Sequence, residues 1–260
     1  MATLWVGELG PMERASLASF ARFDQTVTVF SYTPLADMPK GFENRDANEI
    51  LPTETISYYA KENSPSLHSN FFRYHMMGRS EFMWVDLDVI ALRPFVFDSE
   101  WVYGLQQPDS VNCAVMRVPS DSAVTRELMQ YKAGFRGIPP QVTGLRRLKY
   151  QIRTLGRGLP IEEWIWGSTG PRAFTAALRN HGAFERALPI DAFYPVAVRD
   201  VRQFIEPGRL DDSSFGPDTY GVHLSKSVVE RHAKRDFEGK IPSGSYLDLQ
   251  IAKARAQGFL

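Results

Sequence analysis

Short apolar runs alternate along the chain with apolar residues at helical spacing. Runs of adjacent or alternating apolar residues are typical of buried or half-buried strands. The predicted strands are residues 4–7, 26–30, 82–85, 101–105 and 114–118. Apolar positions three or four residues apart predict helices over residues 13–23, 65–77, 124–133 and 172–179. Because strand and helix follow each other repeatedly, the pattern predicts an α/β sheet with helices on its faces.

Glycine and proline mark the interruptions of this pattern. Gly78 is expected to end the helix over residues 65–77, and prolines such as Pro34 make residues 31–52 rich in loops. The chain has no internal repeat, low-complexity tract or persuasive linker. Its 260 residues, with ordinary apolar and charged fractions, therefore predict one globular domain spanning residues 1–260.

The predicted strand over residues 82–85 runs directly into Asp86-Leu87-Asp88. Side chains alternate along an extended chain, so Asp86 and Asp88 point to the same side. Two neighbouring carboxylates repel each other unless a cation or a proton lies between them. A hard divalent ion, Mn²⁺ or Mg²⁺, is the predicted occupant. The alternative is that this common tripeptide only begins a turn.

Composition excludes several classes of protein. Formal net charge is zero, so no global field draws the chain to nucleic acid or to a membrane. The single Cys113 excludes an intrachain disulfide framework and a thiolate metal cluster. Residues 1–7 lack the basic start and long apolar stretch of a signal peptide, and no window reaches the length of a membrane span. These features predict a cytoplasmic protein.

Residues 68–94 resemble the DXD-type glycosyltransferases of the family 32 group. This group includes yeast α-mannosyltransferases, α-1,4-galactosyltransferases, bacterial capsule transferases and the glucosyltransferase domain of large clostridial toxins. The matching positions are Ser69, Arg73, Tyr74, Gly78, Trp84, Asp86 and Asp88. Two positions depart from the family pattern, because Asn70 stands in place of Asp and Arg79 in place of a second turn glycine. The resemblance implies a GT-A fold with a mainly parallel sheet, whose ligand binds beyond the carboxyl ends of the strands.

The resemblance also implies roles for residues outside the Asp pair. Trp5, followed by Val6, matches the position of a tryptophan that stacks on the uracil of the donor. Asn70 and Arg73 match residues that hold hydroxyls of the donor sugar, and Asn112 matches a contact with the donor sugar or the acceptor. Three of them have a structural alternative: Trp5 as a core tryptophan, Arg73 as a surface arginine, and Asn112 as an asparagine that begins a turn before a strand.

A second group of residues lies toward the C-terminus. His223 matches a late residue that completes the metal shell beside Asp86 and Asp88, and histidine is a suitable ligand for Mn²⁺. Ser225 and Lys226 match small and basic groups near the diphosphate. The alternative for His223 is a purely structural histidine.

The acceptor side is expected near residues 162–171. Glu162 or Glu163 is a candidate base or acceptor contact, and Trp164 or Trp166 is a candidate sugar-stacking wall. Gly170 lies in the Thr-Gly-Pro step that recurs in the family. A solvated helix start explains the acidic residues equally simply.

Residues 132–157 carry seven basic residues, and no Asp or Glu lies between Glu127 and Glu162. Leucine and isoleucine are interleaved with these cations, a pattern that indicates a basic amphipathic segment. It predicts peripheral contact with an anionic inner membrane face or with a lipid-linked acceptor. A solvated helix face is the alternative. Nucleic acid is not expected, because acidic residues elsewhere cancel this charge.

Together these features predict a metal-dependent, retaining hexosyltransferase in polysaccharide synthesis. Asp86, Asp88 and Arg73 would form its catalytic centre, with a UDP-sugar, glucose or galactose, as donor and a glycan or glycolipid as acceptor. Retention rests on the resemblance alone. Two alternatives stay open: a non-catalytic protein that binds sugar nucleotides or glycans, and a nucleotidyltransferase that uses the same Asp–metal chemistry.

Overall fold

A computed structural model describes all residues, 1–260. The chain has an α/β fold with a mixed, mostly parallel central sheet, as predicted. It packs as two compact units that are interleaved in sequence. Unit 1 comprises residues 1–45, 85–98 and 188–260, and unit 2 comprises residues 46–84 and 99–187.

Unit 1 contains the parallel pair at the start of the chain and the C-terminal helices. Its strands are β1 (Ala2–Leu4), β2 (Thr28–Ser31), β3 (Asn44–Asp46), β5 (Val89–Ala91) and β11 (Gly221–His223). Its α-helices are α1 (Pro11–Ala21), α6 (Lys226–Asp236) and α7 (Tyr246–Ala256). Three 3-10 helices, Ile190–Ala192, Val198–Ile205 and Asp212–Ser214, precede β11 in the chain. The strand order in this unit is β3-β2-β1-β4, where β4 (Trp84–Val85) spans the boundary between the units.

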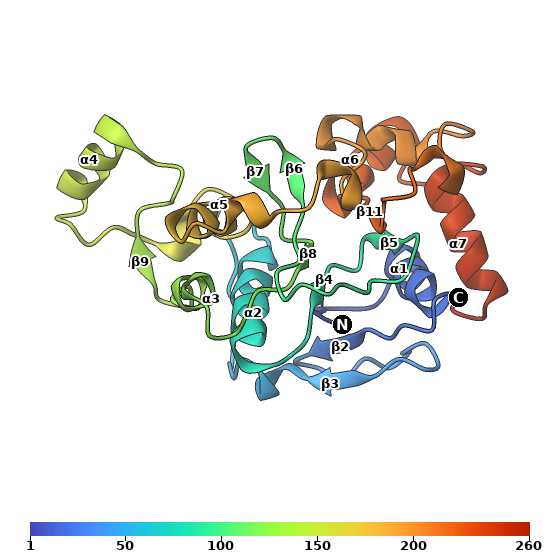
Figure 1. Cartoon of the computed structure of the whole chain (residues 1–260), viewed down its shortest axis with the longest axis horizontal. Coiled ribbons are helices and arrows are strands. Elements are labelled where there is room, and N and C mark those ends of the chain that lie inside the picture. The colour runs from blue at the N-terminus through green and yellow to red at the C-terminus, as the bar shows by residue number, and fades with distance from the viewer. The chain divides into compact units, whose positions relative to one another are not determined.

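Small residues on α1 allow this helix to lie directly against β5. The Ser16 hydroxyl donates to the Val89 carbonyl at 2.7 Å, and the Ala91 N–H donates to the Ser19 hydroxyl at 2.8 Å. All four residues are buried, so these bonds satisfy polar groups that water cannot reach. Figure 1 shows α1 and α7 side by side in this unit.

The antiparallel pairing of β11 with β5 is the feature of unit 1 that positions the site. His223 pairs with Val89, and Gly221 pairs with Ala91. A Cβ atom at Gly221 would lie 3.0 Å from the Ile90 carbonyl oxygen, so this close approach favours a glycine.

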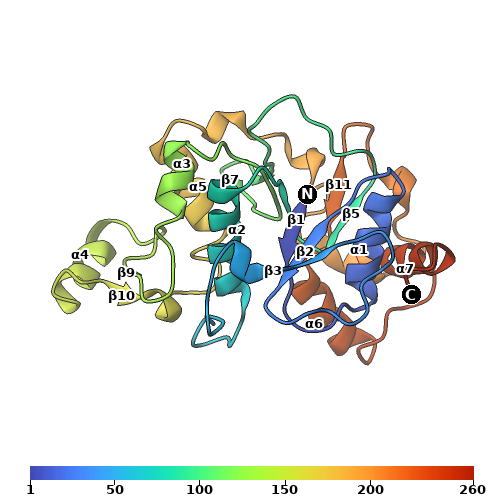
Figure 2. The same ribbon diagram turned by 90° about the horizontal axis from the view of Figure 1, so that it is seen from below.

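Unit 2 is built from three packed helices, short strands and one helix that stands apart. The α-helices are α2 (Ser66–Arg79), α3 (Ala123–Leu128), α4 (Gly144–Arg153) and α5 (Pro171–Asn180). The strands are β6 (Leu105–Gln107), β7 (Ser110–Val111), β8 (Val115–Met116), β9 (Arg136–Gly137) and β10 (Leu159–Pro160). The 3-10 helices are Ala47–Glu49, Ile161–Glu163 and Phe184–Arg186. Figure 2 shows α4 at the edge of this unit, away from α2, α3 and α5.

The predicted helices are present with altered ends. The helix expected to end near Gly78 continues to Arg79, because Gly78 serves packing rather than termination. A Cβ atom there would lie 2.2 Å from the Met129 sulfur, so the missing side chain makes room for α3. The helix expected over residues 124–133 ends at Leu128, and the strand expected over residues 101–105 is a bridge at Val102 followed by β6. None of the helices has the length and apolar character needed to cross a bilayer.

Candidate metal centre

Three potential metal ligands meet in unit 1. Asp86 directly follows β4, Asp88 directly precedes β5, and His223 is the last residue of β11. Since His223 pairs with Val89, its side chain lies next to Asp88, with 3.3 Å between Nε2 and Oδ2. One ligand atom from each of the three residues lies within 4.8 Å of the other two. Two carboxylates and one imidazole at this spacing can hold a divalent ion.

Backbone hydrogen bonds fix the Asp88 end of this cluster. The Leu224 N–H donates to the Asp88 carbonyl at 2.8 Å, and the Lys226 N–H donates to the Asp88 carboxylate at 2.7 Å. Ser225 has the left-handed backbone (φ 56°) that turns the chain from β11 into α6. The first N–H group of α6 therefore points at a carboxylate, which helix N-termini favour.

The environment keeps Asp88 ionised. Burial by itself would raise its pKa, but the charge of His223, a hydrogen bond from His223 and the N–H of Lys226 together hold the pKa of Asp88 below its ordinary value. Only 14% of the Asp88 side chain and 12% of the His223 side chain are exposed. An ionised carboxylate at a partly open position suits the binding of a cation that enters from solvent.

A fully buried acid lies beside this cluster and was not predicted from the sequence. Lys226 Nζ lies 2.6 Å from Glu13 Oε1 and 3.0 Å from Glu230 Oε1. Burial alone would lower the pKa of Lys226, but these two carboxylates raise it, so the ammonium stays charged. Gly10 makes room for Glu13, since a Cβ atom there would lie 2.7 Å from Glu13 Oε2. Nothing in the local sequence distinguishes Glu13 from an ordinary acid in a first helical turn.

Trp5 belongs to the same surroundings. Its ring lies 5.6 Å from Lys226 Nζ, and its indole N–H donates to the Glu8 carbonyl at 3.0 Å. Trp5 is half-buried and Val6 is 43% exposed, so Trp5 is not a core tryptophan. The structure thus brings Trp5, Val6, Ser225 and Lys226 into the unit that holds the three ligands.

Asn70 and Arg73 lie in unit 2, on the buried face of α2. Asn70 Nδ2 donates to the Thr169 hydroxyl at 3.0 Å, and Arg73 Nη1 donates to the Cys113 carbonyl at 2.9 Å. The Arg73 guanidinium also lies over the Trp84 ring, 4.5 Å from its centroid. Arg73 is therefore not the surface arginine of the structural alternative.

Tyr59 and Tyr74 complete this buried network of unit 2. The Tyr74 hydroxyl donates to the Thr169 carbonyl at 2.6 Å, and the Tyr59 hydroxyl lies 2.6 Å from Thr169 Oγ1. Gly170 lies directly against this network, because a Cβ atom there would lie 3.3 Å from Asn70 Oδ1. The Thr-Gly-Pro step thus packs against the helix that carries Asn70.

Asn112 is buried in unit 2 and begins a turn. Its Oδ1 accepts from the Ala114 N–H at 2.9 Å, two residues further on, and its Nδ2 donates to Gln106 Oε1 at 2.8 Å. This is the side-chain-to-backbone turn that asparagine favours before a strand. The structural alternative for Asn112 is thus present in the fold.

Of the predicted acceptor residues, Glu163 is exposed but Trp164 is not. Trp164 is 3% exposed, and its ring packs edge-on against Tyr131 and Phe135. Of the two tryptophans predicted as a stacking wall, Trp164 is therefore excluded, since its ring lies within the core of unit 2. Trp166 is 48% exposed instead, with its N–H donating to the Ser66 hydroxyl at 3.1 Å.

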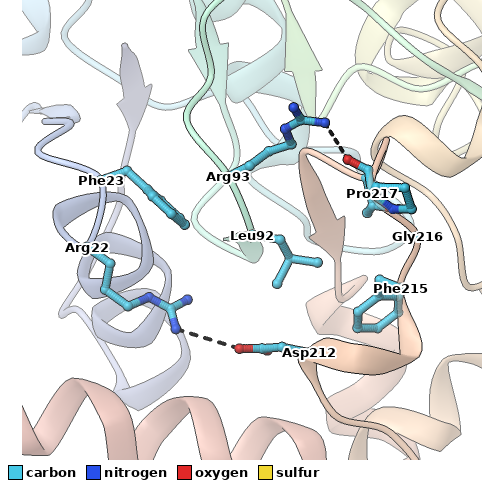
Figure 3. A pocket seen from close by; sticks show the side chains of 9 residues that line it. Arg22, Phe23, Leu92, Arg93, Asp212, Phe215, Gly216 and Pro217 are labelled. Atoms are coloured by element: carbon cyan, nitrogen blue, oxygen red, sulfur yellow. Dashed lines mark hydrogen bonds and ion pairs between the residues drawn. The ribbon is translucent and has the colours of Figure 1, made fainter.

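A separate hollow of about 350 Å³ lies elsewhere in unit 1 (Figure 3). An ion pair of 3.9 Å between Arg22 and Asp212 lies on one side, and a hydrogen bond from Arg93 to the Pro217 carbonyl lies on another. None of the three candidate metal ligands lines this hollow. The hollow therefore adds no group to the metal centre.

No protein-family model, curated protein or solved structure matches this chain. The site must therefore be interpreted from its own chemistry.

Proposed function

We propose that the protein is a metal-dependent glycosyltransferase that moves a hexose from a UDP-sugar to a glycan or glycolipid. The observation that carries the proposal is the cluster of Asp86, Asp88 and His223 at the ends of three strands. The resemblance of residues 68–94 to DXD-type transferases supports it, because the same two aspartates form the motif.

The residues of unit 1 supply the groups that such a donor requires. Asp86, Asp88 and His223 would hold Mn²⁺, which accepts an imidazole beside carboxylates more readily than Mg²⁺ does. An ion held by these residues would supply positive charge to stabilise the diphosphate leaving group. Trp5, half-buried beside Lys226, offers a ring for a uracil base.

Lys226 would contribute to this site by positioning Asp88, because its ammonium is already paired with two acids and is not an unpaired cation. Glu13 and Glu230 both contact its ammonium, while its backbone N–H holds the Asp88 carboxylate. We therefore assign Lys226 mainly to shaping the metal centre. Asn70 and Arg73 remain candidates for orienting the sugar, although both already bond to neighbours within unit 2.

Release of UDP tests this proposal directly. Purified protein is incubated with UDP-glucose or UDP-galactose, with and without Mn²⁺ and before any acceptor is added. We expect Mn²⁺-dependent release of UDP from one of the two, because transferases slowly hydrolyse their own donors. Release of pyrophosphate from a nucleoside triphosphate would instead identify a nucleotidyltransferase. Binding of UDP without turnover, even with acceptors present, would identify a binding protein.

Metal affinity, measured by electron paramagnetic resonance of Mn²⁺, gives a readout that does not depend on activity. Asp88→Asn should weaken Mn²⁺ binding by about 100-fold or more, since it removes a charged ligand. Asp218→Asn, at an exposed aspartate of the same unit, is the matched control and should bind normally. Equal affinity in the two variants would show that the cluster is not the metal site.

A further inference from the structure

Helix α4 (Gly144–Arg153) has no buried side chain, although it carries a row of large apolar residues. Leu145, Leu148 and Ile152 are 80%, 50% and 68% exposed, and Leu155 beyond the helix is 87% exposed. The three helical positions follow the spacing i, i+3, i+7, so they share one face. At least half of each of these three side chains is left uncovered by the rest of the chain.

A helix of this kind needs a partner to be stable. Isolated helices shorter than about 12–15 residues are marginal in water, and most helices in proteins are stabilised by packing of an apolar face. Within unit 2, both views show α4 apart from the other helices (Figures 1 and 2). The apolar face of α4 is therefore available to something outside the chain.

Cations border the apolar row. Arg146, Lys149 and Arg153 repeat the same i, i+3, i+7 spacing one position further along the helix, and Arg147 lies on the opposite flank. None of these four residues forms an ion pair with an acid of the chain, which is consistent with the absence of Asp and Glu from residues 128–161. A hollow of about 650 Å³ lies along the helix between Leu145 and the basic side chains.

We propose that α4 docks in the plane of an anionic lipid bilayer. Its leucine and isoleucine side chains would enter the boundary between headgroups and acyl chains. Arg146, Lys149 and Arg153 would reach the lipid phosphates with their charged ends while their stems lie along the apolar row. Charge complementarity favours this partner. The surface of α4 has basic side chains, no acidic ones, and one apolar row, a combination that matches anionic lipid. The inference does not depend on the glycosyltransferase assignment.

Vesicle cosedimentation of the full-length chain tests the docking. We expect binding to phosphatidylcholine vesicles that contain about a third phosphatidylglycerol, and at least tenfold weaker binding to phosphatidylcholine alone. Binding should weaken as salt rises, because the Debye length falls from about 10 Å at 0.1 M to about 3 Å at 1 M.

Two triple variants separate the charged row from the apolar row. R146Q/K149Q/R153Q and L145S/L148S/I152S should each reduce binding to the anionic vesicles at least about tenfold. The matched control is R231Q/K234Q/K240Q, which removes three exposed cations from unit 1 and should bind like the unaltered protein. Circular dichroism and thermal unfolding establish that all three variants are folded.

A site-specific probe gives the depth of docking. Leu148→Cys can be labelled with an environment-sensitive dye, because the natural Cys113 is buried and therefore protected. The emission should shift to the blue only with anionic vesicles.

An unshifted emission, undiminished binding by either triple variant, or equal binding to neutral vesicles would overturn the proposal. So would sedimentation equilibrium showing an α4-dependent dimer that binds no vesicles, since a second copy would then cover the apolar face.

Discussion

At the scale of single residues, a buried acid outside the Asp-x-Asp motif is linked to the candidate metal centre through Lys226. Glu13 is fully buried, and Lys226 supplies the cation that neutralises it at 2.6 Å. The same lysine donates its backbone N–H to Asp88, so one residue links the buried acid to the metal cluster. The stability contributed by the Glu13–Lys226 pair and the geometry of the candidate metal site are therefore coupled.

Replacing Lys226 tests this coupling. Lys226→Met leaves the Glu13 charge buried without its partner and should lower the free energy of unfolding by about 2–3 kcal/mol, less than for a fully buried pair because the ammonium is a third exposed. The double variant E13M/K226M should regain most of this loss, since apolar side chains can replace a buried pair. Urea unfolding measures both.

Glu230→Gln is the matched control for this experiment. Glu230 pairs with the same ammonium but is 57% exposed, so the variant should change stability by at most about 1 kcal/mol. If K226M lowered the free energy of unfolding no more than E230Q does, the Glu13–Lys226 pair would not stabilise the fold.

At the scale of elements, helix α2 carries the largest part of the sequence motif and packs closely on α3. The contact depends on Gly78, whose missing side chain accommodates Met129 and Thr125. A glycine inside a helix costs about 1 kcal/mol relative to alanine, so the close packing offsets a local disadvantage.

The Gly78 contact can be tested by a double-mutant cycle. In an M129A background, G78A should stabilise the protein by about 1 kcal/mol, because the alanine improves helix propensity and meets no sulfur. In the natural background the same change should give no such gain, since the Met129 side chain must move. Thermal or urea unfolding of the four proteins gives the coupling, and identical effects in both backgrounds would contradict it.

At the scale of the whole molecule, acid sensitivity follows from two buried histidines of unit 2. Burial lowers the pKa of His68 to about 4, and burial aided by Arg79 and Lys132 lowers the pKa of His75 to about 4. In the unfolded chain both pKa values return to about 6.5. The unfolded state therefore binds more protons between pH 4 and pH 6.5, and stability falls as the pH falls through that range.

His75→Leu should flatten this pH dependence. Each histidine contributes a loss of about 1–2 kcal/mol on going from pH 7.5 to pH 5, so the variant should lose less stability over that interval. Neither nitrogen of His75 has a hydrogen-bond partner, so leucine removes no bond and should be tolerated at pH 7.5. Urea unfolding at the two pH values measures the slope. A slope equal to that of the natural protein would mean that His75 is not held neutral.

Local patterns in the sequence determined the α/β class, helices α1, α2, α3 and α5, and the placement of Asp86 and Asp88 on the same side, whereas α6 and α7 were not predicted. The patterns sufficed because helical periodicity, strand alternation and turn residues are properties of neighbouring positions. Local patterns did not place His223 beside these aspartates. The resemblance alone predicted it as a third ligand, and the pairing of β11 with β5 is what brings it next to Asp88.

Tertiary structure alone decided which distant residues meet. It buried Glu13 beneath Lys226, enclosed Trp164 in the core of unit 2, and divided a chain without visible linkers into two interleaved units. These outcomes depend on contacts between segments far apart in sequence. An acid in a first helical turn or a tryptophan in a loop carries no local signal of such contacts. The amphipathic segment was visible from the sequence, but only the fold left its apolar row uncovered.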